Sequence, residues 1–433
     1  MSLPLEAPKV PADATDVSPA RTRRWSPVVA IAAFSVLPVA FAAWQLGRWH
    51  PDEVYQYLEP AWRRVHGFGV VAWEWEVGLR NWAAPIVLSW FIRLTEAIGI
   101  HDPRGIRAVI AVPVLALQVG LLIAAYRYVQ RRLGPTGWPT VFAWLLVAAM
   151  GPVLQFCGRT MGETFSTALL VMAVDRLDRS RESGTRIWIA DGLWGGVLLG
   201  LSVVARYGSA VFVLAALVWL VATRRFRTLG ACCVGGALIA LGLGALDQAT
   251  WGAPFHSLRA YIEFNLLSGH AEAQFGREPW WFYLPFLAYW MAPWAWPGTV
   301  ASVLRERRLP LPTWLAIPYV LAIGATPHKE SRFLYPALVL FALGAAPGLV
   351  ALLRERVGSI GKRRALAVAA LVSGWLFFLG APDFRGDEFR AYVRATRSPE
   401  ATGILVSGEG RWGSGGYFYL GRAIPLYNAA LPE

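Results

Sequence analysis

Long apolar segments alternate with short polar ones along most of this 433-residue chain. A helix needs roughly 17–25 apolar residues to cross a bilayer, and about eleven segments approach or reach that length. The fourth, sixth and ninth are the shortest. The segments cover residues 26–46, 106–125, 140–157, 163–175, 187–204, 208–222, 228–246, 282–301, 312–326, 333–352 and 364–380. The pattern predicts an all-α polytopic membrane protein.

The polar connections between these segments are of two alternating kinds. Every second connection is basic, which marks the cytoplasmic side of a membrane protein. The basic groups are Arg21/Arg23/Arg24, Arg127/Arg131/Arg132, Arg176/Arg179/Arg181/Arg186, Arg224/Arg225/Arg227, Arg305/Arg307/Arg308 and Arg354/Arg356/Lys362/Arg363/Arg364. This regularity predicts a cytoplasmic N-terminus and supports the number of spans.

The connections on the opposite side are longer, acidic and aromatic. In the first, Leu58 and Trp62 recur at helical spacing, whereas Glu59 and Arg63, four residues apart, are expected on the other face of the helix. Pro60 is expected to kink or divide this helix. Two further amphipathic segments, residues 84–98 and 255–267, are typical of helices that lie in the membrane interface.

Three domains follow from this organisation. We expect a disordered cytoplasmic tail over residues 1–25, a transmembrane catalytic domain over 26–380 and a small extracytoplasmic C-terminal domain over 381–433. Basic residues precede the first apolar run, as in a cleavable signal, but the run is longer than a signal core and is interpreted as an uncleaved span. The last domain is expected to be a small α/β unit, with a helix at 387–397, a strand at 403–407 and an aromatic segment at 417–420.

Composition agrees with membrane insertion. Hydrophobic residues make up 56% of the chain and charged residues 16%, against about 25% charged in soluble domains. The net charge of +13 would favour nucleic acid in a soluble protein; here the basic residues are topology signals, so no nucleic-acid partner is expected. Cys157, Cys232 and Cys233 lie in or beside apolar segments and are interpreted as packing residues.

The outer connections carry the candidate chemistry. The sequence His50-Pro51-Asp52-Glu53 follows the first span, and a carboxylate there can act as a general base or cap the next helix. Lys329 and Arg332 can hold a phosphate, and tryptophans on the same face, such as Trp73, can stack on a sugar. Together these groups predict a site for a sugar linked to a lipid phosphate.

Simpler interpretations of the same residues stay open. Arg159 and Glu163 are four apart and can form a helix pair; His50 can be a solvated interfacial residue, and residues 328–332 a charged turn. Arg206 is expected to be a cation that reaches the interface from a helix end. Asp52 and Glu53 could hold a divalent ion, but no dedicated ligand set is present, so no metal is expected.

Four segments resemble, in family order, the lumenal loops of glycosyltransferase family 22, the polyprenyl-phosphate-mannose-dependent mannosyltransferases. They are His50–Glu53 with Glu59-Pro60, Gly67–Gly69, Trp73–Trp75 and Arg80; Arg159–Glu163; Tyr261–Asn265 with Phe275–Trp280; and His328–Pro336. The loops are shorter than in eukaryotic members, and the tail from Asp383 matches no motif of the family.

The resemblance implies a GT-C fold and an inverting transfer of mannose from a polyprenyl-phosphate donor to a glycolipid or glycan acceptor, without a cofactor. Asp52 would be the general base and Glu53 would orient the acceptor. The donor phosphate would be bound by Lys329, Arg332, Arg159 and His328. Substrate would contact His50, Glu59, Trp73, Glu74, Arg80, Glu163 and Glu330. The predominance of Arg among the cations and the abundance of Ala, Gly and Trp suggest a bacterial source. The expected location is therefore a bacterial plasma membrane, with the site on the extracytoplasmic face.

Two alternatives remain from the sequence. The first is a transferase for another polyprenyl-phosphate sugar, such as arabinose or glucose. The second is a transporter or flippase for a lipid-linked saccharide. Transporters place charged residues near the bilayer midplane, often in repeated halves, whereas the polar clusters here are all predicted on one face, which favours an enzyme.

Overall fold

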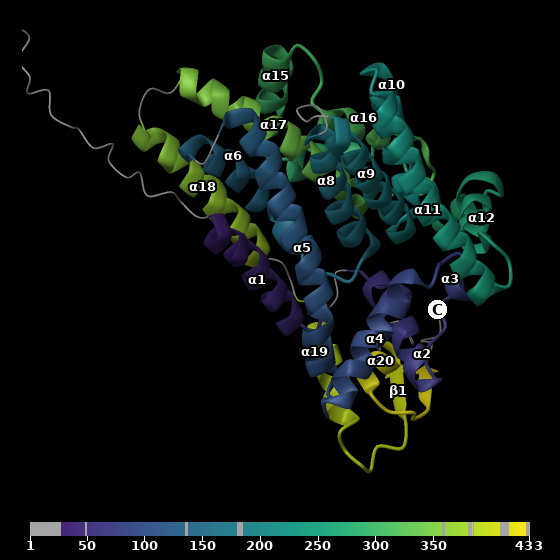
Figure 1. The fold of residues 1–433 in the computed structure, drawn as a ribbon. Coiled ribbons are helices and arrows are strands. Elements are labelled where there is room, and N and C mark those ends of the chain that lie inside the picture. The colour runs from purple at the N-terminus through teal and green to yellow at the C-terminus, as the bar shows by residue number, and fades with distance from the viewer. Residues whose placement is uncertain are drawn as a thin grey trace, which may run out of the picture.

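The structure, a computed structural model, describes most of the chain, and the predicted tail 1–25 lies outside the described residues. The description covers residues 27–47, 50–134, 137–179, 185–356, 360–379, 383, 385–407 and 415–429. Within these ranges the protein is a bundle of helices with a small mixed unit at one end (Figure 1).

Every predicted span coincides with helix. The helices are α1 (Pro27–Trp44), α5 (Pro103–Leu133), α6 (Trp138–Ala148), α7 (Gly151–Phe156), α8 (Gly162–Arg179), α9 (Thr185–Ala205), α10 (Ala210–Ala222), α11 (Phe226–Trp251), α14 (Tyr283–Trp290), α15 (Ala295–Glu306), α16 (Leu311–Ala325), α17 (Tyr335–Arg356) and α18 (Ile360–Leu379). Among the described residues, five of them (α1, α5, α9, α11 and α17) are long and apolar enough to cross a membrane. The fold is therefore the predicted all-α membrane architecture.

Two of the predicted spans are not continuous. The third is divided into α6 and α7, and the eighth into α14 and α15. Pro152 follows the first break and Pro293 lies in the second. Proline lacks an N–H group and disfavours helical conformation in the preceding residue, so an apolar run alone overestimated the length of these helices.

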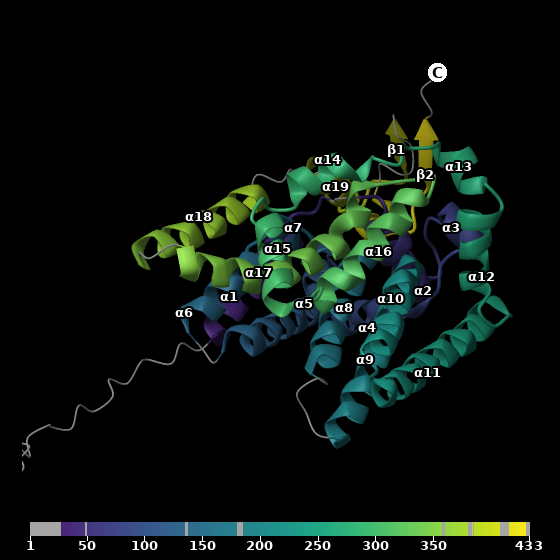
Figure 2. The ribbon, with the colours of Figure 1, turned by 90° about the horizontal axis from the view of Figure 1, so that it is seen from above.

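The centre of the bundle is α17, which packs against α5, α6, α8, α15 and α16. Its side chains from Ala337 to Leu340 are fully buried, as expected for a helix that is apolar on every side. Seen from above, α18 and α11 lie on opposite sides of the bundle (Figure 2). A Cβ atom at Gly196 in α9 would lie 2.0 Å from the carbonyl oxygen of Cys232 in α11, so small residues allow these two helices to approach closely.

Short helices connect the long ones on the predicted outer face, and several of them lie at one end of the bundle (Figure 1). They are η1, a π-helical turn (Glu53–Leu58), α2 (Glu59–His66), α3 (Trp73–Glu76), α4 (Ala83–Ala97), η2 (Tyr207–Ser209), α12 (His256–Ile262), η3 (Glu263–Leu267), α13 (His270–Phe275) and η4 (Ser331–Leu334). Pro60 lies at the start of α2 and divides it from η1, as predicted. The other two amphipathic segments form α4, and α12 with η3.

The C-terminal unit lies against these short helices. It contains α19 (Gly386–Ala395), β1 (Ile404–Ser407), α20 (Gly416–Leu420) and β2 (Leu426–Ala429), and its two strands pair in parallel. Phe389 and Phe418 are buried in one apolar cluster with Trp62 of α2. The predicted helix and first strand are present, and β2 was not predicted.

The helical spacing had suggested that Glu59 lies on the outward-facing side of its helix. The structure contradicts this expectation. The side chain of Glu59 is fully buried and accepts hydrogen bonds from the backbone N–H groups of Val70, Tyr417 and Phe418. The carboxylate is held inside because backbone donors from two distant segments converge on it. Glu59 therefore joins the first outer loop to the C-terminal unit.

Candidate active site

Asp52 precedes the π-helical turn η1 and does not cap it. Its side chain makes no capping hydrogen bond; instead its Oδ2 lies 2.7 Å from the guanidinium of Arg332. π-Helical turns are rare and occur often at functional sites. The capping interpretation of Asp52 is therefore wrong, and two segments from opposite ends of the membrane region meet at this ion pair.

The turn that carries Arg332 is held by its own side chains. Glu330 accepts hydrogen bonds from Arg332 at 2.6 and 3.0 Å, and lies 3.0 Å from the Nε2 atom of His328. Lys329 points away from these groups. Its ammonium donates to the backbone carbonyls of Glu278, Thr326 and Pro327, so Lys329 fixes the turn rather than joining Arg332.

His50 connects the two segments a second time. Its Nδ1 lies 3.1 Å from Asp52 and its Nε2 lies 3.2 Å from Glu330. An imidazole can donate to both carboxylates only in its protonated form. Exposure of the side chains falls inward, from 31% for His50 to 8% for Arg332 and 3% for Glu163. The cluster thus runs from the partly exposed His50 to the buried Glu163.

Two residues on the buried side of the cluster, Glu163 and Arg206, extend it. Glu163 at the start of α8 forms an ion pair with Arg206 at 2.5 Å and lies 3.5 Å from Arg332. Arg206 also stacks on the ring of Phe333. Arg206 follows the end of α9, as expected, but its side chain is largely buried and paired with Glu163 instead of reaching the interface. A single arginine after an apolar helix gave no signal for this role, because its partner Glu163 belongs to another segment.

A second polar group, Gln56, Glu74 and Arg80, lies beside the charged cluster. Gln56 donates to Glu74 at 3.0 Å, and Glu74 lies 3.6 Å from Arg80. The charge of Arg80 also acts on the carboxylate of Asp52. Of the predicted substrate contacts, Glu74 and Arg80 therefore lie near the site, whereas Glu59 is occupied by backbone donors.

Trp73 faces the third outer loop. Its ring packs against Phe264 and Phe275, and Phe275 in turn packs against His328. These aromatic side chains form a wall that leads from α3 to the turn carrying Arg332.

Glu53 and Arg159 belong to a separate pair. Glu53 lies 3.9 Å from Arg159, and Arg159 donates to the carbonyl of Gly47 and to the side-chain oxygen of Gln45. Arg159 is not paired with Glu163, whose described partners are Arg206 and Arg332. The predicted helix pair is therefore wrong, and Arg159 supports the loop that leads to Asp52.

Electrostatics keep Asp52 ionised. Burial raises the pKa of Asp52, but the charge of Arg332 and the hydrogen bond and charge of His50 outweigh burial and hold that pKa well below its usual value. The described residues contain no group of three or more His, Cys, Asp or Glu arranged to hold a metal ion. The ionised carboxylate of Asp52 thus lies beside the guanidinium of Arg332, in a cluster that also contains Glu163, Glu330 and Arg206.

Comparison with known proteins assigns the family. The sequence pattern of the Alg9-like mannosyltransferase family matches residues 29–381. The chain belongs to this family. Family membership agrees with the resemblance inferred from the outer-loop segments, and the matched range includes every candidate site residue.

Curated relatives carry two kinds of names. GPI mannosyltransferase 3 of Yarrowia lipolytica is 27% identical over 335 residues, covering 75% of this chain and 62% of that protein. An undecaprenyl phosphate-alpha-4-amino-4-deoxy-L-arabinose arabinosyl transferase of Pseudomonas paraeruginosa is 28% identical over 349 residues, covering 74% and 60%. The chain thus spans about three fifths of the length of these relatives.

Solved structures support the fold. ArnT from Cupriavidus metallidurans, crystallised with undecaprenyl phosphate, aligns with a TM-score of 0.64 at 13% identity, covering 93% of this chain and 85% of that one. The Archaeoglobus fulgidus oligosaccharyltransferase aligns with a TM-score of 0.58 at 15% identity, covering 93% and 62%. The protein therefore has the GT-C membrane fold that these enzymes share.

Proposed function

We propose that this protein is an inverting glycosyltransferase. It moves a mannosyl residue from a polyprenyl-phosphate donor to a hydroxyl group of a glycolipid or glycan acceptor. The observation that carries the proposal is the ion pair between Asp52 and Arg332, in a charged cluster that also contains Arg206. A base beside two phosphate-binding cations suits the transfer of a sugar away from a phosphate.

Arg332 and Arg206 bind the donor phosphate. Both guanidinium groups contact Glu163, which sets their separation, and guanidinium groups bind phosphate oxygens through paired hydrogen bonds. Negative charge develops on the phosphate as the sugar departs, and preorganised cations stabilise this charge strongly. Arg206 takes the place of Arg159 and Lys329 in the predicted phosphate site, because the two terminal nitrogens of Arg159 and the ammonium of Lys329 already donate to oxygen atoms of the protein.

Asp52 is the base of the reaction. It takes the proton from the acceptor hydroxyl while that oxygen forms a bond to the anomeric carbon. The bond between the anomeric carbon and the phosphate oxygen breaks, and its electron pair leaves with the lipid phosphate. Attack opposite to the leaving group inverts the anomeric configuration. Because the donor phosphate competes for Arg332, its binding weakens the hold of Arg332 on Asp52 and makes the carboxylate a better base.

The site is proposed to face the extracytoplasmic side. The basic connections lie at the end of the bundle away from the candidate active site, which supports a cytoplasmic position for that end. In this orientation the donor is reached from the outer leaflet, in agreement with an integral membrane enzyme that uses a lipid-linked substrate.

The test is an assay of label transfer. Purified full-length protein is incubated in lipid with polyprenyl-phosphate donors that carry labelled mannose, arabinose or glucose, together with a lipid extract as acceptor. We expect transfer from the mannose donor, and only a small fraction of it in the Asp52→Asn variant. Failure with these three donors and with the amino-sugar donor described below would refute a polyprenyl-phosphate transferase.

One alternative has its own support. Curated relatives of similar identity and coverage are named arabinosyl transferases, so a 4-amino-4-deoxy-L-arabinose donor is the second candidate. Adding this donor to the same assay separates the two possibilities. Preferential transfer of the amino sugar would replace the mannosyl proposal and leave the proposed roles of Asp52 and Arg332 in place.

A further inference from the structure

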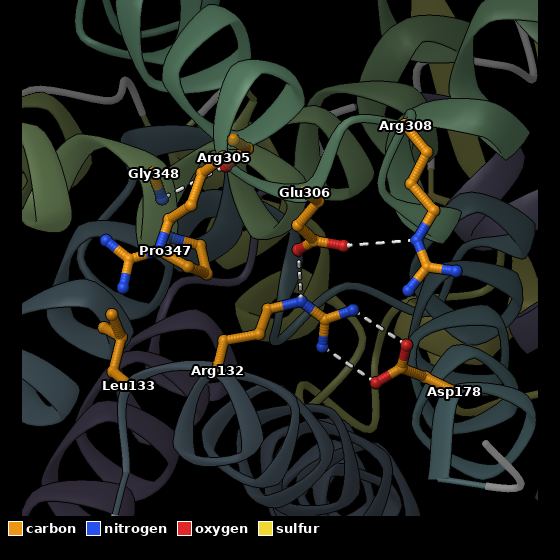
Figure 3. Close-up of a pocket in the computed structure, with 9 residues that line it drawn as sticks. Arg132, Leu133, Asp178, Arg305, Glu306, Arg308, Pro347 and Gly348 are labelled. Carbon is orange, nitrogen blue, oxygen red and sulfur yellow. Dashed lines mark hydrogen bonds and ion pairs between the residues drawn. The ribbon is translucent and has the colours of Figure 1, made fainter. Parts of the chain in front are cut away.

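A charged pocket lies at the end of the bundle opposite to the candidate active site. It has a volume of about 200 Å³ and is formed by the ends of α5, α8 and α15 together with α17 (Figure 3). The other end of α5 lies near the C-terminal unit, since Asp102 pairs with Arg397. The pocket is therefore separated from the candidate active site by the length of α5. The proposed function does not use this pocket.

The carboxylates in the pocket are already neutralised. Arg132 donates to both oxygens of Asp178 at 2.8 Å and to Glu306 at 3.0 Å, as Figure 3 shows. Asp178 is paired in addition with Arg131. Arg132 is itself largely buried, so the ends of three helices are joined by charge-assisted hydrogen bonds.

Two cations of the pocket are only weakly engaged. Arg305 lies 3.9 Å from Glu355, and Arg308 lies 3.9 Å from Glu306. These distances exceed those of hydrogen bonds. The two arginine side chains are 59% and 46% exposed, and in the described part of the chain neither guanidinium makes a hydrogen bond that would have to be broken by a ligand.

The backbone holds these two cations at the pocket. Arg307 between them has a φ of 52°, a left-handed conformation that ends α15. The floor is close-packed: Ser302 of α15 accepts a hydrogen bond from the N–H of Gly348 in α17 and donates one to the carbonyl of Gly344. A Cβ atom at Gly348 would lie 2.3 Å from the nitrogen of Ser302, so the floor has no room for a larger residue.

We propose that Arg305 and Arg308 bind the phosphate of an anionic phospholipid in the leaflet opposite to the active site. Guanidinium groups match phosphate in charge and geometry, and basic pockets between membrane helices on the cytoplasmic side hold anionic headgroups. A lipid rather than a free phosphate is favoured because Leu304, beside Arg305, is 74% exposed and lies on one face of α15 with the exposed Trp296 and Val300. The acyl chains would lie along this surface while the headgroup enters the pocket.

The experiment compares two double variants of the full-length protein. Arg305→Gln with Arg308→Gln removes the proposed ligands. Arg224→Gln with Arg227→Gln removes two exposed arginines from another basic connection of the same face, outside the pocket. Each purified protein is titrated with phosphatidylglycerol, with phosphatidylcholine and with inorganic phosphate, and bound lipid is counted by native mass spectrometry.

We expect the pocket variant to bind phosphatidylglycerol at least about tenfold more weakly than the unmodified protein, and the control variant to bind it normally. The single variants, Arg305→Gln and Arg308→Gln, should each give a partial loss, which keeps the test valid if the double variant does not fold. Equal losses in the pocket and control variants would overturn the proposal. So would equally strong binding of phosphatidylcholine, or full displacement of the lipid by inorganic phosphate at millimolar concentration.

Discussion

The carboxylate of Asp52 lies 2.7 Å from the guanidinium of Arg332, although the two residues belong to the first and the last of the outer loops between membrane helices. The contact joins the proposed base directly to the proposed phosphate ligand. Binding of one substrate therefore changes the electrostatic surroundings of the group that acts on the other.

Removing Arg332 should change the pH dependence of the reaction. In the unmodified protein Asp52 remains ionised through the acidic range, because Arg332 and His50 hold its pKa below the usual value against the effect of burial. In Arg332→Gln burial would still raise the pKa, so activity should fall as the pH decreases toward the new, higher pKa. The profile of kcat/KM between pH 5 and 8 measures this change.

The same variant should lose about 10²–10³-fold in kcat at neutral pH, as expected for a group that stabilises developing charge. Arg332→Lys keeps the charge and should restore the acidic limb of the unmodified enzyme, with incomplete recovery of rate. Identical pH profiles for the unmodified and Gln proteins would mean that Arg332 does not control Asp52.

Asp52→Asn should abolish most turnover and leave folding intact. A positioned base contributes about 10²–10⁴-fold to rate, and asparagine has nearly the same shape without basicity. Asp387→Asn is the control, because that aspartate is almost fully exposed in α19 and should keep full activity. Normal kcat in Asp52→Asn would remove the base assignment.

Substitutions of Arg206 and Lys329 should affect different properties of the enzyme. Arg206→Gln should raise the KM for the lipid donor or lower kcat, since Arg206 is proposed to contact the phosphate, and loss of the buried pair with Glu163 should also lower thermal stability. Lys329→Gln should lower thermal stability without changing the KM for the donor, because three backbone carbonyls would lose their cationic donor. If Lys329→Gln affected only the donor KM, the original phosphate role of Lys329 would be restored.

Glu59 should make stability depend on pH. Burial raises its pKa from 4.5 to about 7, and the three backbone N–H donors lower it only in part. A group whose pKa is raised on folding stabilises the folded state most below its unfolded pKa, and this contribution is lost as the pH rises through the folded pKa. The free energy of unfolding should therefore decrease between pH 4.5 and 7, by at most about 3 kcal/mol.

Thermal unfolding of the unmodified protein and of Glu59→Gln, followed from pH 5 to 8, measures this contribution. The difference in Tm between the two proteins should change with pH, whereas a matched variant at the exposed Glu76, Glu76→Gln, should follow the unmodified protein. A difference that stays constant over this range would show that Glu59 does not titrate in the folded state.

The sequence predicted the helical architecture because apolar runs and basic connections are local signals. It also predicted that the loop of Asp52 and the turn of Arg332 share a site, since the outer-loop segments occur in the order of a known family. Breaks inside apolar runs were missed, although Pro152 and Pro293 were visible signals. Periodicity could not divide one span into two helices.

Partners that are distant in the chain were not predictable from the sequence. Arg206 gains its role from Glu163, and Glu59 gains its role from the backbone of residues 70, 417 and 418. Neither relationship leaves a pattern in local spacing. Lys329 was assigned to phosphate from its charge and from the family resemblance of its segment, whereas nearby carbonyls already accept hydrogen bonds from its ammonium.

The three bonds to Glu59 have a practical consequence for protein engineering. The family match ends at residue 381, but two of these bonds come from Tyr417 and Phe418. A chain shortened to the matched range would keep a buried carboxylate with a single remaining donor and would expose the aromatic surface of Trp62. Expression for structural or enzymatic work should therefore retain the polypeptide at least through α20, even though the family pattern does not reach it.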